Sequence, residues 1–426
     1  MNIKQPNFQQ PAGTLSRKER IVWIDQLRGF AFLLVIIGHS LSKGPLKEWI
    51  YSFHMPLFFI ITGLTLNTDK LLKIGFFEYI RKNTRELLIP YFWLYFFLIP
   101  FEWFRVSFIC GKTFHPLNYL IGFFESNNNI GSLVSIPLYF LPLLFVSKLA
   151  VMIIVKLTHG SRVYCSVAFS FILCSWLFFN GKSTVWHLTS VPAVIFFIYS
   201  GTLIMELYRK YEEKLKSSKA YIYISVIAVL FALGVVFSNI IGRASMHHST
   251  YGSNLLFFLL AAFSSSFAVT MIFIRLPALH LFGFLGKYSL FCIGIHLTVI
   301  KLINSAFPAL EKPLWAMPVK VVAVLLVLIP LSFIFERTAP YLAGKRVASL
   351  SAPIKAFKFT SVIWVSFTYF AFTVKKFISP IQEHFFTLVL LSVGYLAICF
   401  LFTVAVNRFL PEFFMQSRQL ERNSPQ

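Results

Sequence analysis

Apolar runs of nearly constant length recur along the whole chain. Each holds about 20 residues, the length that an α-helix needs to cross the hydrocarbon core of a bilayer. Hydrophobic residues make up 57% of the 426 residues and charged residues only 13%, whereas a soluble domain carries roughly 25% charged residues. A β-barrel would instead show short segments of alternating polarity. The chain is therefore predicted to be an all-α polytopic membrane protein.

The apolar runs predict about twelve membrane spans. Their predicted limits are 21–41, 49–66, 86–104, 136–155, 163–180, 187–206, 220–239, 254–274, 282–303, 314–335, 359–375 and 386–407. No soluble domain fits between the spans. No internal repeat is visible either, so an inverted-repeat transporter has no support in the sequence.

Basic residues gather in every second loop between the predicted spans. The formal net charge is +23, an excess that in a soluble protein would suggest nucleic-acid binding. Here the basic loops alternate with poorer ones such as 239–253, in which Arg243 is the only lysine or arginine. Because basic loops stay in the cytoplasm, both termini are predicted to be cytoplasmic, and nucleic acid is not an expected partner. Lys375 and Lys376, beside the last two spans, break the alternation.

The first predicted helix carries Asp25, Arg28 and His39. Arg28 and His39 lie about three turns apart on one face, separated by a rise of roughly 16 Å. Ionisable groups at membrane depth are costly, and they persist mainly where they face a bundle interior or a cavity. The second span contains His54 close to Pro56, which releases a backbone carbonyl. Because a short loop joins these antiparallel spans, His39 and His54 are expected at similar depth.

The same residues also permit purely structural roles. Asp25 and Arg28 have the spacing of an ion pair at the mouth of the helix, and a buried His39 could donate to a backbone carbonyl. Both kinds of role stay open on the sequence alone. The five cysteines lack the spacing of metal ligands, so no metal site is predicted.

Two segments, IDQLRGFAFLLVIIGHS and SFHMPLFFIITG, resemble the integral-membrane acyltransferases called acyltransferase-3. The family signature is a basic residue, ten residues and then a histidine, which Arg28 and His39 match. Weaker resemblances follow in order: RKNTRELLIPYF (81–92), YFLPLLF (139–145), LGKYSLFCIGIH (285–296) and FERTAPYLAG (335–344). The resemblance implies a membrane acyltransferase core of about ten spans at 21–346. It is preceded by a cytoplasmic tail (1–20) and followed by about two further helices (347–410) and a second cytoplasmic tail (411–426).

The chain departs from the family pattern at several positions. The family's paired arginines, Arg-x-x-Arg, appear here as Lys82 and Arg85, and lysine keeps the charge but lacks the bidentate fork of arginine. Tyr139 stands where a tryptophan is usual, and Ile293 where an aromatic residue is usual. The expected contact with phosphate is therefore least secure at Lys82.

The resemblance implies transfer of an acyl group, usually acetyl, from cytoplasmic acyl-CoA to a hydroxyl of an envelope glycan or glycolipid. Acyl-CoA is then a co-substrate, no cofactor is permanently bound, and the bacterial inner membrane is the expected location. Membrane lipids and a glycan or lipid-linked sugar are the expected partners, and a homo-oligomer is left open.

These expectations assign roles to individual side chains. His39 is the candidate general base, because imidazole suits proton transfer at neutral pH; a transient acyl-histidine is the variant. Arg28 at the cytoplasmic mouth, oriented by Asp25, belongs to the same catalytic set. Three basic residues would hold the phosphates of CoA, unless they only mark topology: Arg81, Lys82 and Arg85. Three others would contact the acceptor: His54, His296 and Glu102. For His296 the alternative is a hydrogen bond between helices, and for Glu102 an ion pair with Arg105.

Three other classes of protein compete with this interpretation. A transporter or flippase for a lipid-linked sugar also needs charges in a cavity, but it should show repeats or paired broken helices. A polysaccharide polymerase should carry its chemistry in large outer loops, whereas the ionisable residues here gather in the first two spans. A sensor or scaffold would transfer no acyl group.

Overall fold

The structure is a computed structural model that describes residues 21–126, 134–161, 163–179, 181–182 and 184–338. This part of the chain is almost entirely helical, and its only strands are β1 (Ala244–Ser245) and β2 (Thr250–Tyr251), which pair antiparallel. The two predicted spans 359–375 and 386–407 and both predicted tails, 1–20 and 411–426, lie outside the described residues.

Each of the first ten predicted spans coincides with a helix. These helices are α1 (Val22–Ser40), α2 (Pro45–Leu64), α5 (Ile89–Phe104), α8 (Phe140–Leu157), α9 (Val163–Phe179), α10 (Val191–Ser217), α11 (Ala220–Ile241), α12 (Leu255–Arg275), α13 (His280–Ala306) and α14 (Ala316–Thr338). In the described chain, 8 helical segments are long and apolar enough to cross a membrane, and α2 and α9 are not among them. The all-α membrane architecture is confirmed, whereas the count of twelve spans and the side of the termini stay predictions.

Shorter elements connect the long helices. The α-helical ones are α3 (Thr68–Lys73), α4 (Phe76–Asn83), α6 (Pro116–Glu125) and α7 (Ser135–Leu138). Two π-helical turns, η1 (Thr84–Leu88) and η2 (Arg105–Ile109), make α4 and α5 parts of one long segment. Three 3₁₀ turns complete the set: η3 (Val185–Ser190), η4 (Met246–His248) and η5 (Pro308–Leu310).

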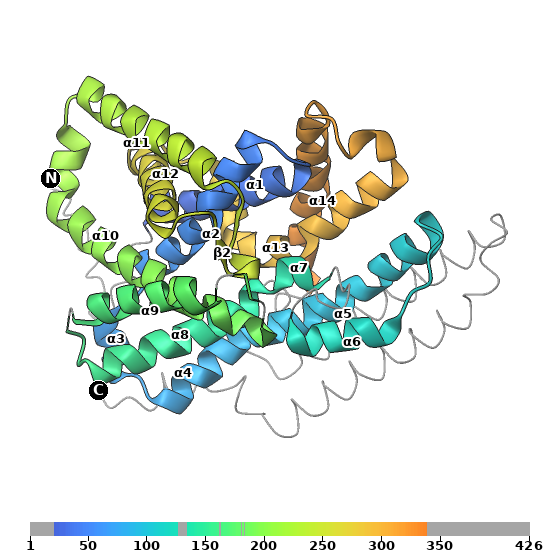
Figure 1. Ribbon diagram of the computed structural model, residues 1–426, viewed down its shortest axis with the longest axis horizontal. Helices are drawn as coiled ribbons and strands as arrows, with labels where there is room; N and C mark the ends of the chain where they lie inside the picture. The colour runs from blue at the N-terminus through green and yellow to red at the C-terminus, as the bar shows by residue number, and fades with distance from the viewer. Residues whose placement is uncertain (1–20, 127–133, 162, 180, 183, 339–426) are drawn as a thin grey trace, which may run out of the picture.

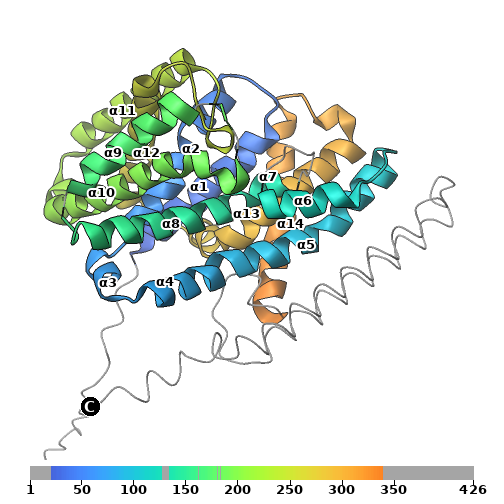
Figure 2. The same ribbon diagram turned by 60° about the horizontal axis from the view of Figure 1, so that its bottom comes forward.

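Helix α1 lies in the middle of the bundle, in contact with α2, α12, α13 and α14. Figure 1 shows α11 and α12 on one side of it and α14 on the other, and Figure 2 shows α8 running above α4 and α5. The contact with α13 is especially close, because a Cβ atom on Gly29 would overlap the carbonyl oxygen of Phe282, and one on Gly286 would overlap that of Asp25. Small residues allow such approach between membrane helices, and here they bring α1 and α13 together along their length.

The connection between α11 and α12 is folded tightly against η3. Ser190 Oγ donates to the carbonyl oxygen of Met246 at 2.6 Å, and hydroxyl bonds join Ser249 to Thr189 (2.7 Å) and to Ser190 (2.8 Å). The amide of Gly181 also donates to the carbonyl of Ser249. We call residues 242–254 the outer loop, following their predicted side of the membrane. These bonds hold the outer loop in one place.

Candidate active site

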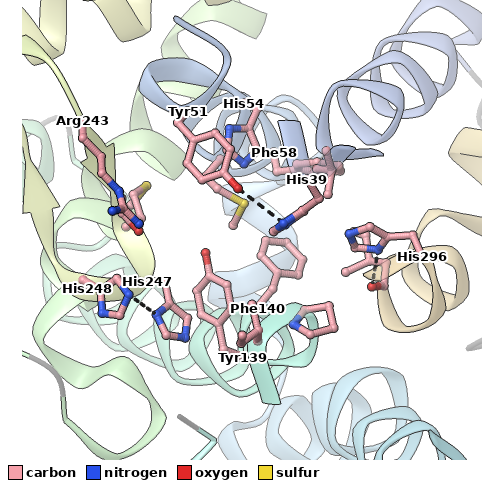
Figure 3. A pocket seen from close by; sticks show the side chains of 17 residues that line it. His39, Tyr51, His54, Phe58, Tyr139, Phe140, Arg243, His247, His248 and His296 are labelled. Atoms are coloured by element: carbon pink, nitrogen blue, oxygen red, sulfur yellow. Dashed lines mark hydrogen bonds between the residues drawn. The ribbon is translucent and has the colours of Figure 1, made fainter. Parts of the chain in front are cut away.

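A pocket lies between α1, α2, α13, the segment of α7 and α8 around Tyr139, and the outer loop. Apolar side chains form part of its lining, with Val35, Met55, Phe58 and Phe140 among them. The polar side chains that line it are His39, Tyr51, His54, Tyr139, Arg243, Ser245, His247, His248 and His296. Figure 3 shows the histidines, Tyr51, Tyr139 and Arg243 converging from separate elements on one space. A pocket in which polar groups converge between apolar walls is the usual form of an active site.

His39 stands in the last turn of α1 and faces Tyr51 of α2. Its Nδ1 atom lies 3.4 Å from the Tyr51 hydroxyl oxygen (Figure 3). The short connection from Leu41 to Gly44 turns the chain back into α2, and therefore places Tyr51 beside His39. If Nδ1 carries the proton and donates to Tyr51, then Nε2 keeps a lone pair that can accept a proton. The alternative role for His39, a hydrogen bond to a backbone carbonyl, is not seen among the described residues.

His296 comes from α13 and is fully buried. Its ring centroid lies 5.2 Å from that of His39. Its Nδ1 atom is 2.7 Å from the carbonyl oxygen of Ile293, and because a carbonyl can only accept, Nδ1 must carry the proton. The Nε2 atom is buried without a hydrogen-bond partner in the described structure. A buried acceptor of this kind needs a partner, and a substrate hydroxyl entering the pocket would supply one.

His54 is also tied to its own helix. Its Nδ1 atom donates to the carbonyl oxygen of Ile50 at 2.7 Å, which fixes the same tautomer as in His296. His54 lines the same pocket as His39. Tyr51 lies between them, with its ring centroid 5.0 Å from that of His54 and 6.0 Å from that of His39.

The outer loop forms the wall opposite His39 and His296 (Figure 3). His247 contacts His187 and His248, with ring centroids 4.5 and 4.4 Å apart, and Tyr139 lies 4.8 Å from both His187 and His247. Burial, with His187 and His248 nearby, lowers the pKa of His247 to about 3. Burial and the charge of Arg243 lower the pKa of His248 as well. Both imidazoles are therefore neutral near pH 7.

The sequence did not single out Tyr51, Arg243, His247 or His248 as site residues. Tyr51 could have been found, because it precedes His54 by three positions and so shares its helix face. The three loop residues carry no such signal, since only folding brings 243–248 back over α1. Among the described residues, no three His, Cys, Asp or Glu side chains are arranged to hold a metal ion.

The other end of α1 carries the charged residues of the predicted cytoplasmic mouth. Arg28 Nη1 lies 3.8 Å from Asp25 Oδ1, which is the ion pair that the spacing allowed. Arg81 and Lys82 lie in the last turn of α4, and Arg85 follows in η1. The structure thus separates the predicted site residues into a histidine pocket and a basic region about three turns of α1 away.

Lys148 of α8 joins this basic region, and the sequence analysis missed it. It lies within electrostatic reach of Arg28, Lys82 and Glu86, and α8 packs against both α4 and η1. Lys148 is the only charged residue in the predicted span 136–155. That isolation in an apolar run was a signal of function, because such residues are rare at membrane depth.

Glu102 does not line the histidine pocket. Arg105 binds it through two hydrogen bonds, of 2.8 Å from Nε and 2.7 Å from Nη2. The Tyr119 hydroxyl also donates to it at 3.4 Å, and Glu102 is only 2% exposed. The ion pair that the sequence allowed is present, and the contact of Glu102 with sugar stays a prediction.

Comparisons with known proteins agree with the arrangement of motifs. A family model described as an acyltransferase domain, Acyl_transf_3, matches residues 21–337. The nodulation protein NolL of Mesorhizobium japonicum is 35% identical over 95 residues, which are 20% of this chain and 24% of NolL. The match thus spans about a quarter of that relative's length. No solved structure matches the chain.

Proposed function

Because the chain belongs to the acyltransferase-3 family, we propose that this membrane acyltransferase moves an acetyl group from acyl-CoA to a hydroxyl of an envelope glycan or glycolipid. The observation that carries the proposal is the pocket in which His39, Tyr51 and His296 meet. It offers several imidazole nitrogens to a hydroxyl that enters the cavity. The transporter and polymerase alternatives have no finding in their favour.

His39 acts in this proposal as the general base. With Nδ1–H donating to the Tyr51 hydroxyl, Nε2 takes the proton of the acceptor hydroxyl as its oxygen attacks the thioester carbonyl. A tetrahedral intermediate forms, the carbon–sulfur bond breaks, and the CoA thiolate recovers the proton from the imidazolium. The products are an ester and CoA with a free thiol, so that atoms and charge balance.

His54 and His296 act as acceptors of hydrogen bonds. Their Nδ1 protons are already given to the carbonyls of Ile50 and Ile293, so the neutral rings have no N–H left for an oxyanion. Their Nε2 atoms can instead orient hydroxyls of the sugar. The Tyr51 hydroxyl is then the donor best placed to reach the oxyanion, since it lies between His39 and His54.

In this proposal the acyl-CoA donor binds at the cytoplasmic end of α1, opposite the histidine pocket. The cluster that would bind it consists of Arg28, Lys148 and the three basic residues predicted from the sequence, Arg81, Lys82 and Arg85. Asp25 orients Arg28. Such a cluster suits the phosphates of acyl-CoA. The rise of roughly 16 Å between Arg28 and His39 suits an extended pantetheine arm that presents its thioester at the pocket. The proposal places the enzyme in the bacterial inner membrane with both termini in the cytoplasm.

Transfer of label by the purified protein in liposomes tests the function. Labelled acetyl-CoA is supplied with glycan from a strain that lacks the gene, and the wild-type protein is expected to label the glycan. His39→Ala should insert normally but lose transfer by about 100- to 10,000-fold, as expected for removal of a general base. His280→Ala is the control, because His280 is exposed at the start of α13 and does not line the pocket. Substantial transfer by His39→Ala would overturn the assignment of His39.

A further inference from the structure

The pocket has an unbalanced charge on its outer-loop wall. Of the 17 lining residues, none is acidic, and Arg243 is the only one that is always charged. Arg243 is exposed and makes no ion pair or hydrogen bond with any described residue. Figure 3 shows it beside His248, across the cavity from His39. A guanidinium left without a partner at the wall of a substrate pocket is available to a ligand.

Other cations reinforce Arg243. The Lys47 ammonium is held at the start of α2, where it donates to the carbonyl oxygens of Leu41 (2.7 Å) and Ser42 (3.2 Å). It lies within electrostatic reach of both Arg243 and Lys320. Cations with no lining carboxylate produce a positive potential, and in a cleft with apolar walls that potential is focused on the ligand.

The loop that carries Arg243 is rigid enough to be selective. Arg243 directly precedes the β1 residue Ala244, which pairs with Tyr251. The serine and threonine bonds described above then fix Met246 and Ser249 against η3. Since His247 and His248 are neutral near pH 7, Arg243 is the fixed charge of this wall. Its planar fork matches the two oxygens of a carboxylate or phosphate.

We infer that the acceptor is anionic, and that Arg243 binds a carboxylate or phosphate of the acceptor close to the hydroxyl that is acylated. This inference rests on the proposed function and names the class of its acceptor. The phosphates of the acyl donor are not the expected ligand of Arg243, because the basic cluster assigned to them lies at the other end of α1.

Fractionated glycan tests the class of acceptor. Polysaccharide and glycolipid from the deletion strain are separated by anion exchange into a neutral and an acidic pool, and each is offered to the wild-type protein in liposomes with labelled acetyl-CoA. Label is expected in the acidic pool. Carbodiimide reduction of carboxylates, or removal of phosphates with hydrofluoric acid, then shows which group is needed. Equal labelling of the neutral pool would overturn the inference alone, and no labelling of either pool would overturn the proposed function with it.

Variants at Arg243 test the residue. On the acidic pool, Arg243→Gln keeps hydrogen-bond donors but loses the charge, and kcat/KM for the acceptor should fall on the order of 10- to 100-fold. Arg243→Lys should retain most activity, and neither variant should change the KM for acetyl-CoA. Lys312→Gln removes a charge on the same predicted side, outside the pocket lining, and should behave as wild type. A wild-type acceptor kcat/KM in Arg243→Gln would show that Arg243 binds no anion.

Discussion

The imidazole rings of His39 and His296 lie 5.2 Å apart, although they come from the first and the ninth predicted spans. The backbones of α1 and α13 approach closely at Gly29 and Gly286, and the amide of Leu279 donates to Gln26 Oε1 at 2.9 Å near the start of both helices. Two histidines are thereby brought to one pocket with different hydrogen bonds. The hydroxyl of Tyr51 faces His39, whereas a backbone carbonyl binds His296.

The two histidines should differ in how much they contribute. His296→Asn keeps a donor for the Ile293 carbonyl but removes Nε2, so it should lower kcat about 10-fold and leave the KM for acyl-CoA unchanged. His39→Asn should lower kcat about 100-fold or more, because the base itself is lost. Steady-state transfer in liposomes measures both. The reverse order of effects would make His296 the base.

Tyr51→Phe should slow the reaction without weakening donor binding. The variant lacks the hydroxyl that faces His39 Nδ1. The proton of His39 is then no longer held on Nδ1, and Nε2 is no longer kept free to act as the base. Because the same hydroxyl is also the proposed oxyanion donor, its loss should lower kcat by about 100-fold or more. Tyr223→Phe is the matched control, because its hydroxyl bonds to the Met271 carbonyl outside the pocket lining. An unchanged kcat in Tyr51→Phe would remove Tyr51 from the mechanism.

The basic residues at the other end of α1 should govern the acyl donor. Lys82→Ala combined with Arg85→Ala should raise the KM for acyl-CoA about 10-fold or more, since each charged hydrogen bond is worth roughly 1.5–3 kcal/mol. Lys148→Met, which keeps the length of the side chain, should do the same.

Arg209→Ala combined with Lys210→Ala controls for topology. It removes two exposed charges from another predicted cytoplasmic segment and should leave the KM unchanged. If all these variants keep the wild-type KM, then Lys82 and Arg85 only orient the protein in the membrane, and Lys148 does not bind the donor.

The close crossing of α1 and α13 should tolerate no side chain. Gly286→Ala would place a methyl group on the Asp25 carbonyl, and overpacking of this kind costs about 1–3 kcal/mol. The melting temperature in detergent and the rate of transfer should both fall, because His39 and His296 are forced apart. Gly283→Ala, on the same helix, points into open space and should leave both unchanged. Equal effects of the two changes would show that α13 does not depend on the close approach.

Local pattern was enough to predict much of the fold. The length of the apolar runs placed the ten long helices, because a bilayer sets that length and every backbone group must be bonded within the helix. The 3.6-residue period put Asp25, Arg28 and His39 on one face. The family signature and its late histidine pointed to His54 and His296 as further site residues, and all three histidines do line one pocket.

The helical period of a sequence, however, does not predict which other helix a given face packs against. Tyr51 shares a helix face with His54, and Lys148 stands alone in its apolar run, but only the tertiary structure shows what each of them faces. Helix α2 packs against α1, and α8 packs against α4 and η1. The ion pair of Glu102 with Arg105 shows the converse, because spacing allowed it and only the fold shows that it forms and lies outside the pocket.

The sequence alone therefore determined the class of the protein, its helices and the acid, base and histidine of α1, since all of these follow from hydropathy and local spacing. The tertiary structure decided the chemistry of the pocket wall. Arg243, His247 and His248 face His39 across the pocket because hydroxyl bonds to η3 hold the outer loop there. Those bonds join residues far apart in the chain, and no local pattern specifies them.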